Sequence, residues 1–155
     1  MTAEMRWFVD IDATPERVWQ VLTDVPAYPQ WNPFITGIKG TSAVGGRMSV
    51  SLAHLTVVFR RTLRPRVLEV TRGRRLRFRL RLARLGTPGL LDTEHTLTIT
   101  AHDDGRVRLW HQVNFEGLLV PLVTRSLNRG NGPSFNTMNA ALKDRAEGTL
   151  PTHSG

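Results

Sequence analysis

Three of the five histidines share a strand face with apolar residues. Alternate positions of a strand point to one face of a sheet. By this rule His54 faces the same way as Met48, Val50 and Leu52, His95 the same way as Leu97 and Ile99, and His111 the same way as Leu109, Val113 and Phe115. An imidazole titrates near neutrality and acts as a general acid or base. The pattern predicts histidines lining one apolar cavity, suited to the proton transfers of aldol cyclisation, dehydration or enolisation.

A structural role is the alternative for each of these histidines, as a hydrogen-bonded core residue or, for His54, a residue at a predicted strand end. The spacing of His95 and His111 depends on the register of the hairpin that contains them. If Ile99 lies beside His111, the two histidines stand about 13 Å apart at roughly 3.3 Å per residue, too far for contact. The sequence leaves this separation open.

Other chemistries lack their signatures. The chain has no cysteine, which excludes thiolate catalysis and every cysteine-containing metal site. The three histidines show no ligand spacing of the HExxH kind, there is no GxSxG serine elbow, and the glycines lack the spacing of a phosphate loop. We therefore expect no metal and no cofactor.

The elements that must position the histidines follow an α+β order. Met5–Ile11 alternates polar and apolar residues as a strand does, and Thr14 can cap a helix that starts at Pro15 and ends by Pro26. The segment 27–34, rich in proline and aromatic residues, predicts a short second helix or a turn.

From about residue 35 to 115 the chain shows strand-like runs separated by turn signals, which predicts an antiparallel meander. The clearest strand is Leu76–Leu82, where apolar residues alternate with arginines. Helices are expected at about 118–128 and 135–147; the second carries an apolar stripe of Phe135, Met138, Leu142 and Ala146. We expect one domain over residues 1–148 and a frayed tail over 149–155.

Composition limits the partners. No apolar run approaches the roughly 20 residues of a membrane span, and the first residues alternate as no signal peptide does, so we expect a cytoplasmic protein without integral membrane association. The net charge of +8 is almost entirely arginine, since Lys39 and Lys143 are the only lysines. These arginines are spread over many segments, which indicates solvated strand faces. We expect no nucleic-acid partner.

Several stretches resemble one family in the same order along the chain. Ile11–Asp24 and Tyr28–Ile35 resemble the opening of the bacterial polyketide cyclase/dehydrase branch of the START/Bet v 1-like (SRPBCC) superfamily. Glu94–His95, Phe115–Leu119 and Met138–Glu147 resemble later parts of the same family. The resemblance implies a helix-grip fold, in which a curved antiparallel sheet wraps around a C-terminal helix and encloses an apolar cavity.

The resemblance also implies a hydrophobic small-molecule ligand and places Trp31 and Asn32 near the cavity entrance, although Trp31 as a structural plug is the alternative. With strand parity it predicts ligand contacts from Trp31, Asn32, Met48, His54, Phe59, Phe78, Phe115, Phe135 and Met138. We expect a cofactor-independent cyclase or dehydratase of natural-product biosynthesis that uses His95 or His111 for proton transfer. A non-catalytic carrier or sensor of a lipid-like ligand is the alternative, and the sequence fits a monomer or a homodimer.

Two departures from the family pattern affect these expectations. Members often carry a glutamate in the last strand, two residues before the phenylalanine, where this chain has Val113. This puts acid chemistry at that position in doubt. In addition, Arg129–Pro133 interrupts what is usually a continuous helix, because proline removes an amide donor and glycine lowers helix propensity. We expect a kink or break there that widens or gates the cavity mouth.

Overall fold

The computed structural model describes residues 1–41, 43–52, 62–81, 89–128 and 135–148. The strands are β1 (Thr2–Ile11), β2 (Ile35–Gly40), β3 (Met48–Leu52), β4 (Thr62–Leu63), β5 (Arg66–Thr71), β6 (Arg75–Arg81), β7 (Asp92–Ala101) and β8 (Val107–Glu116). The helices are α1 (Pro15–Thr23), the 3₁₀ helix η1 (Val25–Ala27), α2 (Tyr28–Trp31), α3 (Val120–Asn128) and α4 (Phe135–Glu147).

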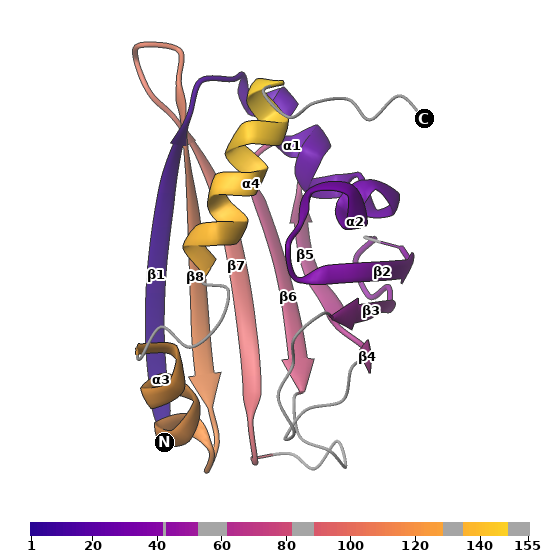
Figure 1. The fold of residues 1–155 in the computed structure, drawn as a ribbon, viewed down its shortest axis with the longest axis vertical. Coiled ribbons are helices and arrows are strands. Elements are labelled where there is room, and N and C mark those ends of the chain that lie inside the picture. The colour runs from indigo at the N-terminus through magenta and orange to yellow at the C-terminus, as the bar shows by residue number, and fades with distance from the viewer. Residues whose placement is uncertain (42, 53–61, 82–88, 129–134, 149–155) are drawn as a thin grey trace.

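The strands form two antiparallel sheets. The larger has the order β1-β8-β7-β6-β5 and the smaller β2-β3-β4, with a bridge between Arg47 and Arg66. Figure 1 shows α4 lying across the larger sheet, with α1 and α2 near the C-terminal end of α4 and α3 beside the N-terminal end of β1. The expected α+β fold, an antiparallel sheet packed against a C-terminal helix, is confirmed.

The first elements form as their residues predict, with small shifts of boundary. β1 begins at Thr2 and keeps the expected alternation, so that its odd-numbered residues face inward. Thr14 caps α1, its side-chain oxygen accepting a hydrogen bond from the amide of Arg17 at 3.2 Å. The helix ends at Thr23, and Pro26 lies in the 3₁₀ turn that follows.

Two apolar clusters fill the space between the larger sheet and the helices. The first joins α1 and α4 to the sheet and includes Ile11, Leu22, Leu97, Leu109 and Leu142. The second lies under α3 and consists of Leu91, Val113, Phe115 and Val120, with Trp7 and Phe135 packed against it. The predicted stripe of α4 is therefore its inner face.

The two C-terminal helices lie in different places. α3 ends at Asn128 beside β1, whereas α4 starts at Phe135 and crosses the sheet (Figure 1). The break predicted at Arg129–Pro133 lies outside the described residues, as does the tail 149–155.

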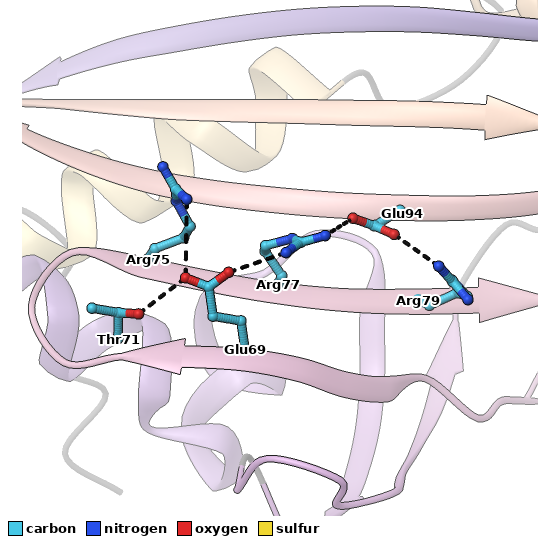
Figure 2. Close-up of polar contacts among 6 residues, drawn as sticks. All are labelled: Glu69, Thr71, Arg75, Arg77, Arg79 and Glu94. Carbon is cyan, nitrogen blue, oxygen red and sulfur yellow. Dashed lines mark hydrogen bonds and ion pairs between the residues drawn. The ribbon is translucent and has the colours of Figure 1, made fainter.

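The outer face of the sheet carries arginines matched by carboxylates. Figure 2 shows Arg75, Arg77 and Arg79 of β6 between Glu69 of β5 and Glu94 of β7. Arg77 contacts both glutamates, and Arg79 Nη2 lies 3.1 Å from the Glu94 carboxylate. The hydrogen bond from Arg77 lowers the pKa of each glutamate below its usual value. This part of the outer face is polar, as predicted for a solvated strand, whereas Phe8 and Trp110 form an aromatic pair on β1 and β8 with Phe8 half exposed. Among the described helices, none is long and apolar enough to cross a membrane.

Candidate functional site

His95 and His111 meet on the inner face of the larger sheet. The register of β7 with β8 places His95 opposite Val113 and Leu97 opposite His111, so the two histidines are diagonal neighbours. Diagonal side chains on one face of a sheet are close enough for long residues to touch. His95 Nδ1 lies 3.1 Å from His111 Nε2, a hydrogen bond between imidazoles. The register thus settles the separation that the sequence leaves open.

Aromatic rings surround the pair on three sides. Phe78 of β6 lies opposite His95 in the sheet and stacks on its ring, with centroids 4.8 Å apart and planes inclined by 7°. Trp7 of β1 lies opposite His111 and meets it edge-on at 6.0 Å. Phe135, the first residue of α4, approaches both rings, at 6.0 Å from His95 and 4.9 Å from His111. The histidines therefore sit in an aromatic cage where the two apolar clusters meet.

Burial keeps both imidazoles neutral. His95 is 8% exposed and His111 is 2% exposed. Desolvation lowers the pKa of His95 well below its usual value, and the neighbouring His111 lowers it further. Desolvation also lowers the pKa of His111, to about 4, although hydrogen bonding with the Asn139 side chain acts in the opposite direction. At neutral pH the pair is a set of uncharged donors and acceptors.

The hydrogen-bond chain allows two proton arrangements. Thr93 Oγ1 lies 3.3 Å from His95 Nε2, so the chain runs from Thr93 through His95 to His111. In one arrangement His111 Nε2–H donates to His95, which leaves His111 Nδ1 bare as an acceptor. In the other, His95 Nδ1–H donates to His111, and His111 Nδ1 carries the proton. Within the described residues His111 Nδ1 forms no hydrogen bond of normal geometry, although the Asn139 side chain lies close enough to act on His111 as a hydrogen-bonding partner.

Asn139 of α4 is the polar residue that sequence reasoning missed. It is 2% exposed, lies one helical turn after Phe135 and stands beside His111. Neither the oxygen nor the nitrogen of its amide forms a hydrogen bond of normal geometry among the described residues. The available signal was an asparagine one position beyond Met138 in the inward stripe, where an apolar residue is expected.

The other predicted contact residues divide into two groups. Phe115 belongs to the cluster that contains Trp7 and Phe135, whereas Met48 and Met138 are half-buried against the cluster that contains Phe78. His54 and Phe59 lie outside the described residues.

Trp31 belongs to the same apolar cluster as Leu97 and Leu109, but neither Trp31 nor Asn32 has a described ring contact or hydrogen bond with the histidines. Trp31 is buried, stacks on Tyr28 at 4.8 Å and lines an open depression of about 380 Å³ together with Arg17 and Arg145. Asn32 is buried, and its side-chain oxygen accepts a hydrogen bond from the amide of Phe34 at 2.9 Å. The Trp31 Nε1 and Asn32 Nδ2 nitrogens are buried and have no hydrogen-bond partner among the described residues, so a ligand contact and a structural plug both stay predictions for this segment.

Within the described residues, no three His, Asp or Glu side chains converge as metal ligands. The arrangement instead offers neutral hydrogen-bonding groups inside an aromatic cage. Such a site can bind the polar atom of an otherwise apolar molecule and exchange a proton with it.

Known proteins share this architecture. A family model described as "Polyketide cyclase / dehydrase and lipid transport" matches residues 2–147. The structure is similar to norcoclaurine synthase from Thalictrum flavum, a point mutant in complex with a transition-state analogue, with a TM-score of 0.73 and 11% identity over 96% of each chain. No curated protein sequence matches the chain.

Two bacterial structures are also similar. The Zhui aromatase/cyclase from Streptomyces sp. R1128 has a TM-score of 0.73 and 14% identity, and the match covers 100% of this chain and 99% of that one. A START superfamily protein from Mycobacterium smegmatis has a TM-score of 0.69 and 16% identity, over 95% of this chain and 99% of that one. At these identities the likeness shows the fold alone.

Proposed function

Because the chain belongs to the polyketide cyclase/dehydrase and lipid transport family, we propose that it binds a hydrophobic molecule against the His95–His111 pair and converts it. The reaction proposed is ring closure or water loss, without a cofactor. The observation that carries the proposal is a hydrogen-bonded pair of buried imidazoles inside a cage of aromatic rings.

The pair suits a reaction in which a proton is borrowed and returned. His111 Nδ1 accepts a proton from the carbon next to a ligand carbonyl, and the C–H electron pair forms the enolate. In ring closure the enolate carbon bonds to a second carbonyl carbon, whose oxygen takes the proton back from the imidazolium. In water loss the enolate expels a β-hydroxyl, which leaves as water with that proton. Both reactions begin and end with neutral imidazoles.

Burial makes the return of the proton favourable, and it makes the first proton transfer from carbon correspondingly harder. An imidazolium in an apolar site is a stronger acid than one in water, because desolvation opposes its charge. Both histidines are buried, and the pKa of each is lowered for this reason. The rings of Trp7, Phe78 and Phe135 provide apolar walls for a planar ligand and restrict its orientation.

One observation favours a carrier instead. Among the described inward side chains around the pair, none is a carboxylate, and Val113, where the family resemblance leads us to expect glutamate, is fully buried. Neutral imidazoles and an amide are sufficient to hold a ligand oxygen without reaction. The alternative function is therefore the binding and release of a lipid-like molecule.

Native mass spectrometry of the purified protein with pools of aromatic polyketides and lipids, followed by product analysis, tests the two functions. For an enzyme we expect a captured compound to be converted, and His95→Ala and His111→Ala to abolish turnover while binding persists. His102→Ala is the matched control, because His102 lies in the turn between β7 and β8 with an exposed side chain. Capture and release of unchanged ligand would identify a carrier.

A further inference from the structure

The free edge of β1 is open to pairing with another chain. β1 is an edge strand of the larger sheet (Figure 1), and among the described strands it pairs only with β8, residue by residue and without a bulge. Bulges, prolines and inward-pointing charges are among the features that protect sheet edges from pairing with other chains. β1 has none of the three, since its inward residues are Ala3, Met5, Trp7, Val9 and Ile11.

The backbone groups of the even-numbered residues of β1 face this edge. Gly117 donates its amide hydrogen to the Met1 carbonyl oxygen at 3.0 Å, in line with the register of β1 and β8. In an antiparallel pair, residues that exchange hydrogen bonds alternate with residues that do not. The odd-numbered residues of β1 therefore bond to β8, and the amides and carbonyl groups of the even-numbered residues point away from it.

α4 covers only one end of the edge. Lys143 donates to the Asp10 carbonyl oxygen at 2.9 Å, and Glu147 accepts a hydrogen bond from the Asp12 amide at 2.8 Å. Both backbone groups belong to even-numbered residues, which agrees with the alternation along β1. Within the described part of the chain, the outward backbone groups of residues 2–8 have no such partner. Residues 2–8 are therefore the open part of the edge.

The open edge is complementary to itself in charge. In an antiparallel pair of two β1 strands, even-numbered residues must face even-numbered residues, because only these offer backbone groups. With the two-fold axis at Met5, Glu4 lies opposite the Arg6 of a second copy, and Arg6 lies opposite its Glu4. The two side chains are 52% and 55% exposed and lie 4.0 Å apart within one chain. A pair of copies would therefore carry four alternating charges on its outer face.

Neighbouring registers are less favourable. An axis at Glu4 or at Arg6 places like charges directly opposite each other, which is destabilising. An axis at Trp7 places Glu4 opposite Asp10, again two like charges. An axis further along the strand engages the Asp10 carbonyl oxygen, to which Lys143 already donates. The remaining register is the one that places Glu4 opposite Arg6.

We propose that two copies of the chain associate through residues 2–8 of β1, antiparallel and with the two-fold axis at Met5, so that the two larger sheets become one. The backbones then exchange about eight hydrogen bonds, two for each facing pair of even-numbered residues. On the inner face, the small Ala3 lies opposite the second copy's Trp7, which also belongs to the aromatic cage of the candidate site. The interface is small, so we expect a dissociation constant on the order of 10–100 µM.

Analytical ultracentrifugation of the full chain from about 1 µM to about 500 µM measures this association. Glu4→Arg and Arg6→Glu each place like charges opposite each other twice, so each should raise the dissociation constant about tenfold or more. The two variants mixed in equal amounts should associate as the wild type does, because every arginine of one then faces a glutamate of the other. Glu16→Arg is the matched control, because this side chain is 55% exposed on α1, away from β1.

Disulfide formation tests the register directly. The two Met5 residues form a non-hydrogen-bonded pair, in which Cα atoms lie about 4.5 Å apart, a distance that a disulfide spans. The chain has no cysteine of its own. Met5→Cys should therefore cross-link to a second copy on mild oxidation. Ala3→Cys is the matched control and should not cross-link, because the two copies of residue 3 lie about 13 Å apart along the strands.

Four results would overturn the proposal. The first is a chain that stays monomeric over the whole concentration series. The second is self-association that neither charge reversal weakens, since it would come from another surface. The third is failure of the mixed variants to associate, and the fourth is equal cross-linking of Met5→Cys and Ala3→Cys. None of these readouts depends on ligand binding or turnover, so the interface and the proposed function stand or fall separately.

Discussion

Acid should destabilise the protein well above the pH at which its carboxylates titrate, because of the histidine pair. The pKa of His111 is lowered to about 4 by burial, against about 6.5 in an unfolded chain. Between these values the unfolded chain binds a proton that the folded protein does not. The stabilisation is thus fully present above pH 6.5 and is lost as the pH falls toward 4. His95 shifts in the same direction and adds to the effect.

The magnitude follows from the difference between the two pKa values. Each pH unit within this window costs about 1.4 kcal/mol for one histidine. Between pH 7.5 and pH 5, His111 alone should lower the free energy of unfolding by about 2 kcal/mol. With a urea dependence of roughly 2 kcal/mol per molar, the unfolding midpoint should fall by about 1 M. The glutamates paired with arginine have lowered pKa values and titrate below this range.

Urea unfolding at pH 7.5 and pH 5, followed by tryptophan fluorescence, measures the effect. His111→Gln removes the titrating group and should reduce the pH-dependent loss by about 2 kcal/mol relative to wild type. His102→Gln, in a side chain that is 39% exposed, is the control for a histidine outside the core. Equal pH-dependent losses in wild type and His111→Gln would refute the argument that burial holds His111 neutral.

Two further predictions concern the framework around the site, and both use urea unfolding. Gly117→Ala should destabilise the protein by about 2 kcal/mol or more, because the residue has a φ of +129° and an added Cβ would lie 2.5 Å from the Leu90 carbonyl oxygen. The control Gly105→Ala should cost clearly less, because this glycine has a φ of +82° but open space around it. Equal losses of stability in the two variants would contradict the prediction. Leu142→Ala, at a fully buried position of α4, should lower the free energy of unfolding by about 2–5 kcal/mol. Leu122→Ala, on the exposed face of α3, should lower it by about 0.5 kcal/mol or less. Similar losses from the two substitutions would contradict the packing of α4 on the sheet.

Much of the fold was predictable because its signals are local. The period-2 pattern assigns an inner face to β1, β7 and β8, and α4 occupies the predicted range 135–147 with its apolar stripe inward. The sequence predicts a single meander, whereas the strands form two sheets with one isolated bridge between Arg47 and Arg66. This division depends on which strands pair, and the local pattern of a strand does not contain that information.

The candidate site was predictable only in part, because its geometry depends on register and tertiary packing. Parity places His95 and His111 on one face, but only the pairing of Leu97 with His111 brings their rings into contact. Asn139 escaped because its polarity contradicts the stripe in which it lies, and a helical pattern contains no information about the strand residue that it meets. Trp31 was expected near the ligand on the basis of resemblance, whereas its described contacts lie with Tyr28 and in a separate depression.

The charge distribution of the sheet restricts the kind of reaction that the histidine pair can carry out. The outer face pairs arginines with Glu69 and Glu94 (Figure 2), whereas the described inner groups around His95 and His111 are neutral. A neutral interior opposes any bound state with a net charge. A proton taken from a ligand carbon must therefore return to the same ligand, which requires an oxygen within reach of His111. A molecule without such an oxygen should therefore be bound and released unchanged, even if the protein is an enzyme toward its own substrate.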